Sequence, residues 1–199
     1  MAQSYIKRIL NAQVYDVARE TPLDAAPLLS ARLGNQAFLK REDLQPVFSF
    51  KCRGAYNKMI HLDEAARAGG VVAASAGNHA QGVALAASKL GIKATIVMPV
   101  TTPLIKVDAV KALGAKVVMH GDSFDEAAVR ARALTESEGF TFIHPFDDPD
   151  VIAGQGTVAV ELVRQAQQPL DYVFVCCGGG GLLAGMAAYL RHVWPQTWI

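Results

Sequence analysis

The chain has 199 residues, of which 51% are hydrophobic and 19% are charged. This balance is typical of a folded globular protein and excludes a disordered one. Nineteen basic and eighteen acidic side chains leave a formal net charge of +1. Because no long basic run occurs either, the sequence does not favour binding to nucleic acid or to an anionic membrane surface.

The cysteines and the first residues indicate the compartment. The three cysteines are Cys52, Cys176 and Cys177. The count is odd, neighbouring cysteines rarely form a bridge, and no CxxC or Cys/His spacing suits zinc. The first ten residues contain Lys7 and Arg8 but no apolar segment of a signal peptide. We therefore expect a protein of the reducing cytoplasm with no metal site.

The middle of the chain alternates short β-branched runs with longer alanine-rich helical patterns. The expected strands are 71–74, 94–98, 116–119 and 141–143, and the expected helices are 78–90, 103–113 and 123–138. Gly91, Gly114 and Gly139 each follow a helix, where a left-handed residue is favoured, and Ser123 is a suitable cap. This alternation predicts βαβ units in an α/β fold, with a parallel sheet covered on both faces.

A second α/β segment begins near Ile152. The pattern predicts helices at 157–165 and 182–193, a strand at 172–175, and the first residues of another strand at 197–199. A sheet that stopped on this last strand would leave its edge unpaired. We therefore expect the chain to be the amino-terminal portion of a longer protein.

The segment 172–190 is uncharged and is long enough to cross a bilayer. Four consecutive glycines lie within it, however, and they would break a lipid-exposed helix. A short strand, a glycine turn and a helix explain this segment better than a membrane span.

The first motif that suggests chemistry is Ser-Phe-Lys-Cys-Arg at 49–53. Pro46 and Ser49 precede a run suited to a helix, which places Lys51 near the amino end of that helix. The positive end of the helix dipole disfavours an ammonium, and Phe50 would reduce its hydration. Both effects favour the neutral, nucleophilic amine that Schiff-base chemistry requires. On this segment alone, a solvated lysine at a helix start is the more frequent situation.

The second motif, Ser-Ala-Gly-Asn-His-Ala-Gln-Gly at 75–82, follows a predicted strand and opens a helix. Small residues let backbone amides approach a ligand, and a helix start favours an anion. Ser75 and Asn78 add donors for a carboxylate or a phosphate. The alternative is a plain strand-to-helix turn in which Asn78 is the cap, and a lone His79 is more often structural than catalytic.

The third motif is the glycine run at 178–181, again between a predicted strand and a helix. Such turns bind phosphates through backbone amides and the helix dipole. Four glycines destabilise a segment that has no use for them, so the functional interpretation is favoured. Gly179, Gly181 and Ala184 also match the dinucleotide-binding fingerprint, but the acidic residue that completes it would lie beyond residue 199.

Taken in order, these motifs resemble the pyridoxal-phosphate enzymes of the tryptophan-synthase β-like fold (fold type II), and within them the threonine dehydratases. The similarity covers nearly the whole chain. It includes the segments 21–23, 40–43, 49–51, 75–82, 153–157 and 178–182. The stretches 45–47 and 51–56 look most similar to the biosynthetic dehydratases of isoleucine synthesis.

The resemblance implies a division into two domains of open parallel sheets with flanking helices. Residues 1–57 and 152–199 would be part of a large, truncated cofactor-binding domain. Residues 58–151 would form a small α/β domain. The helical segment around 154–157 would be a structural joint between the two domains. The resemblance also implies a tetramer or another homo-oligomer.

The resemblance also assigns roles to individual residues. Lys51 would condense with the aldehyde of pyridoxal 5'-phosphate, and Phe50 would pack against the pyridine ring. The phosphate would be bound through the backbone amides of Gly178, Gly179, Gly180, Gly181 and Leu182. The substrate carboxylate would be bound by the loop of Ser75, Ala76, Gly77, Asn78 and His79, with Asn78 also near the cofactor hydroxyl. No metal is implied.

The implied reaction is removal of water from threonine or, as the alternative, from serine, to give a 2-oxo acid and ammonia. Lys51 would remove the Cα proton while the cofactor ring accepts the electrons. A serine racemase is the nearest alternative, but racemases resembling this sequence carry a serine at the position of Ala76, and a methyl group cannot deliver a proton. A nucleotide-dependent oxidoreductase would leave Lys51 and the Asn78 loop unexplained. An inactive fragment is the third alternative, because the family's partner for the pyridine nitrogen would lie beyond residue 199.

Overall fold

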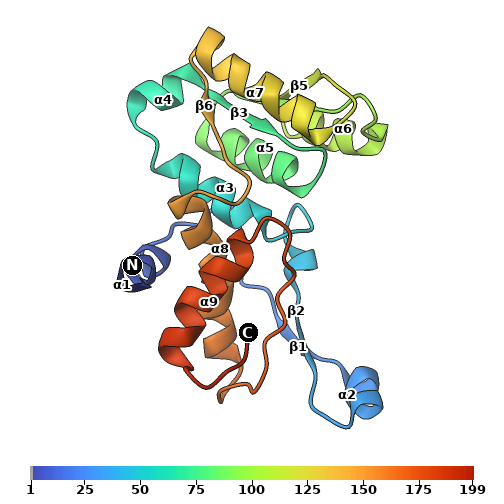
Figure 1. The fold of residues 1–199 in the computed structure, drawn as a ribbon, viewed down its shortest axis with the longest axis vertical. Coiled ribbons are helices and arrows are strands. Elements are labelled where there is room, and N and C mark those ends of the chain that lie inside the picture. The colour runs from blue at the N-terminus through green and yellow to red at the C-terminus, as the bar shows by residue number, and fades with distance from the viewer. Residues whose placement is uncertain (1) are drawn as a thin grey trace.

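The computed structural model describes residues 2–199 and contains a four-stranded parallel sheet in its upper part (Figure 1). The strand order is β5-β4-β3-β6. The strands are β3 (Val71–Ala74), β4 (Ala94–Met98), β5 (Lys116–Met119) and β6 (Thr141–Phe142). The helices that connect them are α5 (Asn78–Leu90), α6 (Leu104–Ala112) and α7 (Phe124–Glu138). The predicted parallel sheet is therefore confirmed, with most element bounds within one residue of the expectation.

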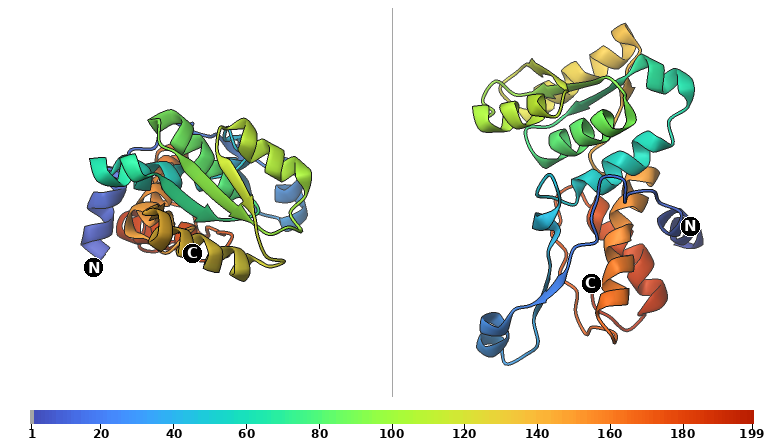
Figure 2. Two further views of the ribbon diagram at one scale, coloured as in Figure 1. Left: turned by 90° about the horizontal axis from the view of Figure 1, so that it is seen from above. Right: turned by 180° about the vertical axis from the view of Figure 1, so that it is seen from behind.

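Helices cover both faces of this sheet, as the top view in Figure 2 shows. On one face, Val72 and Val97 pack against Leu134 of α7. On the other face, Val71 and Ile96 belong to the core that includes α5 and α6. Every residue of β3 and β4 is buried, which explains why these strands read as continuous apolar runs rather than as alternating patterns.

The predicted helix boundaries are supported by their local chemistry. Gly91 and Gly139 end α5 and α7 in the left-handed conformation, with φ of 67° and 71°. Ser123 caps α7, and its Oγ accepts a hydrogen bond from Glu126 N at 3.3 Å. Gly114 also has a positive φ, 89°. The three glycines and the serine therefore act as predicted.

The strand order reverses between β3 and β6. After β3 the chain moves outward to β4 and then to β5, and it returns on the other side of β3 as β6. The carboxyl ends of two neighbouring parallel strands that diverge in this way leave a crevice, which is where α/β proteins bind ligands. Two loops leave this edge, 75–77 after β3 and 144–148 after β6.

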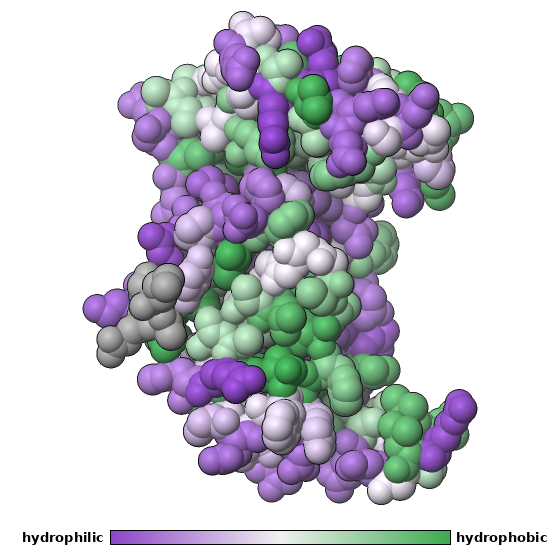
Figure 3. Space-filling model, viewed as in Figure 1, coloured by the Kyte–Doolittle hydropathy of each residue, from purple (hydrophilic) through white to green (hydrophobic). Residues whose placement is uncertain are grey.

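The lower part of the molecule is mainly helical. Its longest elements are α8 (Pro149–Gln165) and α9 (Gly181–Val193), which share a core that includes Leu162, Met186 and Leu190. The remaining elements are α1 (Ala2–Leu10), the antiparallel pair β1 (Leu23–Ala25) and β2 (Phe38–Lys40), α2 (Pro27–Leu33), η1 (Glu42–Leu44), α3 (Lys51–Ile60) and α4 (Glu64–Gly69). Figure 3 shows apolar surface over α9 and over the arm formed by β1, α2 and β2.

Three predictions for the second α/β segment differ from the structure. The expected strand at 172–175 and the expected strand start at 197–199 are reduced to one parallel bridge between Tyr172 and Trp198. The helix expected at 157–165 begins earlier, at Pro149, because Asp148 Oδ1 accepts hydrogen bonds from Asp150 N and Val151 N at 2.8 and 3.1 Å. Gly154 and Gly156 within this helix serve close packing, since a Cβ on Gly154 would lie 2.7 Å from Gly54 Cα and one on Gly156 would lie 3.1 Å from the carbonyl oxygen of Gly185.

The apolar stretch 172–190 contains the glycine turn and most of α9. Within residues 2–199, no helix is both long and apolar enough to cross a lipid bilayer.

α3 lies at the junction between the sheet and the lower helices (Figure 1). It packs closely against α5 at one point, where a Cβ on Gly82 would lie 3.0 Å from the backbone carbonyl of Lys51. It also packs closely against α8, where a Cβ on Gly154 would lie 2.7 Å from Gly54 Cα. Glycine at these positions lets the backbones approach, so α3 is fixed between two helices from different parts of the chain.

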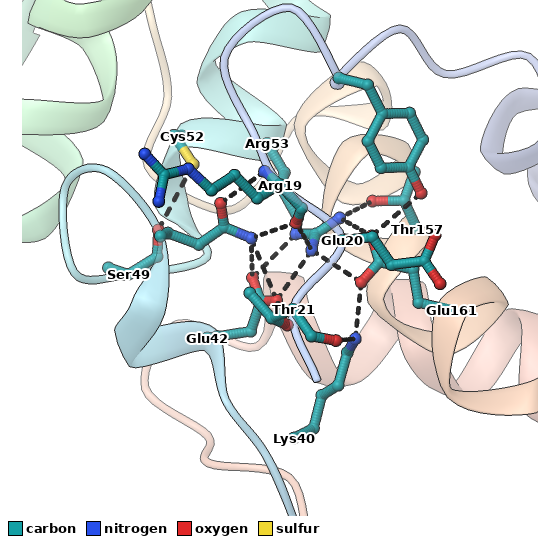
Figure 4. Close-up of polar contacts among 12 residues, drawn as sticks. Arg19, Glu20, Thr21, Lys40, Glu42, Ser49, Cys52, Arg53, Thr157 and Glu161 are labelled. Carbon is teal, nitrogen blue, oxygen red and sulfur yellow. Dashed lines mark hydrogen bonds and ion pairs between the residues drawn. The ribbon is translucent and has the colours of Figure 1, made fainter. Parts of the chain in front are cut away.

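Arg53 lies at the centre of a buried ion-pair network that ties α3 to its surroundings (Figure 4). Its fully buried guanidinium donates to Glu42 at 2.8 Å and to Glu161 at 2.6 Å. Glu161 is also fully buried, and it accepts from Lys40 Nζ at 2.6 Å. Burial alone would raise the pKa of Glu161, but hydrogen bonds and charge from Arg53 and Lys40 outweigh it and hold that pKa below its ordinary value. The network joins α3 to η1, α8 and β2.

We expect Arg53→Met to destabilise the protein strongly, because Glu42 loses its ion pair and the buried Glu161 keeps Lys40 as its remaining ionic partner. Removing one partner of a buried pair costs about 3–5 kcal/mol. The matched control is Arg164→Met, which removes an exposed ion pair with Glu20 and should have a much smaller effect. Urea-induced unfolding of both variants measures the difference, and equal losses would contradict a central role for Arg53.

Candidate functional site

Lys51 is the first residue of α3 and is half-buried. Its Nζ donates a hydrogen bond to the backbone carbonyl of Pro145 at 2.6 Å. The same Nζ lies 5.6 Å from the centre of the Phe50 ring. Phe50 precedes the helix in the capping position and packs its ring against the core between α8 and α9. Lys51 is thus held at a helix start beside an aromatic ring, and its amine points to the turn after β6.

The surroundings of Lys51 favour the neutral amine. Burial lowers the pKa of Lys51 below its ordinary value, and a nearby Cys176 thiolate would partly oppose this shift. The positive end of the α3 dipole acts in the same direction as burial. A lysine with a lowered pKa is a better nucleophile and a better base near neutral pH.

The loop at 75–79 opens α5 at the carboxyl end of β3. Gly77 N donates to Ser75 Oγ at 3.1 Å, and Gly77 is the residue before the helix. Because glycine has no side chain, it cannot accept from the first N–H groups of α5, which are then available to a ligand. Gly77 occupies the capping position and Asn78 is the first helical residue, so Asn78 does not cap α5 and its side chain is exposed. Ala76 is partly buried in the same loop.

His79 is a structural residue by its contacts. Its ring is buried, and Nε2 lies 2.9 Å from the carbonyl oxygen of Ile143. A carbonyl oxygen only accepts, so Nε2 carries the proton. Burial lowers the pKa of His79 to about 4, which keeps the ring uncharged near neutral pH. The side chain therefore joins α5 to the end of β6, and only its backbone amide could reach a ligand.

The glycine run forms a tight turn that leads into α9. Gly180 has a φ of 91°, a left-handed conformation that favours glycine. A Cβ on Gly179 would overlap the ring of Phe146, and a Cβ on Gly181 would lie 2.8 Å from the carbonyl oxygen of Phe146. At Gly178 and Gly180, the described atoms leave open space around such a Cβ. One side of the turn is thus packed and the other is open to a ligand.

The side chain of Leu182, which follows the glycine turn, packs in the core and does not face the open side of the turn. Leu182 is 9% exposed and packs in the cluster between α8 and α9. Only its backbone amide, in the first turn of α9, could bind an anion.

The turn at 144–147 was not predicted as part of the site. Pro145 accepts the hydrogen bond from Lys51, and Phe146 packs on the glycine turn. This turn lies near Lys51 because β6 lies beside β3, and strand order cannot be read from the sequence alone. A weak signal was present, because a His-Pro pair directly follows the last predicted strand and an Asp-Pro pair marks the start of α8.

The structure brings most of the predicted residues together. Direct contacts join Lys51 to Pro145 and Phe146 to the glycine turn, while His79 ties the 75–79 loop to the end of β6. In Figure 1 the segment before α9 arches up toward α3. The amine can attack an aldehyde, the glycine turn can bind an anionic group, and the 75–79 loop can bind a second anion. These three features fit an aldehyde cofactor with a phosphate group, together with a substrate that carries a carboxylate.

We expect Lys51 to react with an acylating reagent at lower pH than an ordinary lysine, because only the neutral amine is nucleophilic. Competitive labelling with acetic anhydride across a pH series, read by mass spectrometry, measures this reactivity. The exposed Lys106 of α6 is an internal reference. A Lys51 labelling midpoint at the ordinary value of 10.5 would contradict the lowered pKa.

Comparison with known proteins agrees with this arrangement. The family described as "Pyridoxal-phosphate dependent enzyme" matches residues 14–199. The chain is 61% identical, over 98% of its length, to the biosynthetic, chloroplastic threonine dehydratase of Arabidopsis thaliana, of which it spans 33%. It therefore covers about a third of that relative.

Two solved structures share the fold. The processed form of threonine deaminase isoform 2 from Solanum lycopersicum is 53% identical, with a TM-score of 0.95, and the match covers 98% of this chain and 57% of that one. Maize serine racemase is 36% identical, with a TM-score of 0.92, over 96% of this chain and 58% of that one. The predicted fold type II architecture and the predicted resemblance are confirmed. The chain belongs to the pyridoxal-phosphate dependent enzyme family.

Proposed function

We propose that the protein containing this chain converts L-threonine to 2-oxobutanoate and ammonia with pyridoxal 5'-phosphate, as the first step of isoleucine biosynthesis. The observation that carries the proposal is the half-buried amine of Lys51, with its lowered pKa, in contact with the turn that packs on the glycine run. The high identity to a biosynthetic threonine dehydratase supports this choice among the reactions of the family.

Lys51 would both bind the cofactor and act as the base that moves the proton of the substrate Cα. When bound, the cofactor supplies an electron sink for the bonds at that carbon. A neutral amine at a helix start is suited to both roles, because the dipole disfavours its protonated form. Phe50 would limit access of water and pack against the cofactor ring.

The two amide-rich segments would bind the anionic groups. The amides of Gly178, Gly179, Gly180, Gly181 and Leu182, at the start of α9, would bind the phosphate. The loop from Ser75 to His79 would bind the substrate carboxylate, mainly through its backbone amides, because the His79 ring is already paired. Asn78, exposed at the start of α5, would reach the cofactor hydroxyl. This arrangement would orient the substrate and support charge, which is the protein's part of the catalysis.

A serine racemase of the same fold is the second candidate, supported by the 36% identity to the maize enzyme. Racemisation needs a proton donor on the face of the substrate opposite Lys51. Ala76 occupies the loop position where a serine would supply this proton, and its methyl group cannot. The site therefore favours elimination.

Several features of the whole protein stay predictions. Residues 58–151 would form the small domain, and 1–57 with 152–199 part of the large one, with the crossing of α3 and α8 as their joint. The protein would be a homo-oligomer, as its family resemblance implies. A cytoplasmic location also stays a prediction, since the Arabidopsis relative is named as chloroplastic.

We expect Lys51→Ala to abolish release of 2-oxo acid from threonine, because the variant has neither the amine that binds the cofactor nor the base. The assay uses the full protein that contains this chain, supplied with pyridoxal phosphate. The wild type should show an absorbance band near the edge of the visible range, and borohydride should fix the cofactor on Lys51. Lys106→Ala, which removes an exposed lysine on α6, is the control and should keep full activity. Equal rates from Lys51→Ala and wild type would remove Lys51 from the mechanism.

We expect the wild-type protein to release 2-oxo acid from L-serine and L-threonine without forming the D-serine isomer. Ala76→Ser introduces a hydroxyl on the loop at the end of β3 and should allow measurable racemisation of serine. Chiral chromatography of the unreacted serine separates the two outcomes, and Ala76→Gly is the control without a hydroxyl. D-serine formed by the wild type at a rate similar to elimination would overturn the choice of a dehydratase.

A further inference from the structure

A single imidazole organises the turn that contacts both Lys51 and the glycine run. His144 directly follows β6, and its Nδ1 accepts hydrogen bonds from the backbone N–H groups of Phe146 at 3.3 Å and of Asp147 at 2.8 Å. The ring thus closes its own turn, in the way that an Asx side chain closes a turn with the amides two and three residues later.

The turn is anchored at its start. Ile143 N donates to Val72 O at 2.9 Å, so the pairing of β6 with β3 extends up to the residue before His144. The carbonyl oxygen of Ile143 contacts the buried ring of His79. The position of the turn is therefore fixed by the sheet, and its shape is fixed by His144.

The His144 ring is also held by its neighbours. It lies edge-on to the ring of Phe146, with centroids 4.7 Å apart and an interplanar angle of 82°. It lies in a similar way against Phe142 of β6, at 6.0 Å and 68°. Aromatic pairs with this geometry are favourable, so the imidazole is oriented from two sides.

The turn makes two contacts with the proposed site. Its Pro145 carbonyl accepts the hydrogen bond from Lys51 Nζ at 2.6 Å. The ring of Phe146 fills the space that a side chain on Gly179 would need. The carbonyl oxygen of Phe146 faces Gly181. If the turn opened, the amine would lose its acceptor and the glycine turn would lose its packed side.

We propose that His144 is a positioning residue: its Nδ1 holds the 144–147 turn in the shape that sets Lys51 and the glycine turn relative to each other. This proposal rests on the proposed function, because it concerns the positions of the amine and the phosphate-binding amides. His144 itself does not touch the reacting atoms and acts through Pro145 and Phe146.

The charge on His144 decides whether the turn can form. A proton on Nδ1 removes the acceptor, so the turn requires the neutral ring. Burial lowers the pKa of His144 below 6.5; the carboxylates of Asp147 and Asp148 oppose the shift, while Arg132 and Lys51 add to it. A lowered pKa means that the neutral form is favoured in the folded protein. The turn is therefore present near neutral pH and is lost as the pH falls through the lowered pKa.

The test compares His144→Leu with His144→Asn in the full protein that contains this chain, without cofactor. Asparagine keeps an acceptor oxygen near the place of Nδ1, whereas leucine fills space without one. Hydrogen exchange of the Phe146 and Asp147 amides should accelerate about tenfold in His144→Leu, because two hydrogen bonds are lost, and stay near the wild-type rate in His144→Asn. Wild-type exchange at these amides, corrected for its intrinsic pH dependence, should also accelerate below the pKa of His144, and that of His144→Asn should not.

A second readout follows Lys51. Without the Pro145 contact the amine becomes more hydrated, so its acylation midpoint should move up toward 10.5 in His144→Leu and return to the wild-type value in His144→Asn. A His144→Leu protein with slow amide exchange and an unchanged Lys51 midpoint would overturn the proposal. Failure of wild-type Lys51 to bind pyridoxal phosphate would instead contradict the proposed function, whatever the exchange rates show.

Discussion

The arrangement of the site depends on one buried guanidinium. Arg53 lies two residues after Lys51 and has no exposed surface. Its charge is stable away from water only because Glu42 and Glu161 surround it, and those carboxylates come from η1 and α8. A rotation of α3 would separate these charges at a cost of several kcal/mol. The backbone of Lys51 is therefore fixed, and its side chain alone can adapt to a ligand.

Close backbone packing restricts α3 in the same way. Gly82 brings α5 against Lys51 and Cys52 at the start of α3, and Gly154 brings α8 against Arg53 and Gly54 of the same helix. α5 follows β3, whereas α8 follows the turn after β6. Each of the two strands at the reversal of the sheet order is thus followed by a helix that packs closely against α3. This explains how a lysine outside the sheet comes to face the crevice at the carboxyl ends of its strands.

The sequence predicted the local structure better than the assembly. Strands such as β4 and helices such as α5 were correct in their bounds, because apolar runs and glycine caps are local signals. The strand at 172–175 was wrong, since one bridge to Trp198 does not make a ladder. The functional interpretation of the glycine run was favoured from residue types alone, whereas Lys51 was singled out only by the resemblance of the whole series of motifs. The Pro145–Lys51 contact joins residues 94 positions apart, and it depends on strand order, which no local pattern encodes.

The site also shows why glycine and small residues recur at its edges. Three helices, α3, α5 and α9, begin near the site. Gly82 of α5 packs on the backbone of Lys51, His79 of α5 contacts the carbonyl oxygen of Ile143, and Gly181 of α9 packs on Phe146. Each helix start carries unpaired N–H groups and a partial positive charge. Together these helix starts disfavour an ammonium and favour anions. In the proposed function, a site built in this way would keep the amine of Lys51 neutral and would offer the 75–79 loop and the glycine turn to negative groups, so the same backbone geometry would support both the nucleophile and anion binding.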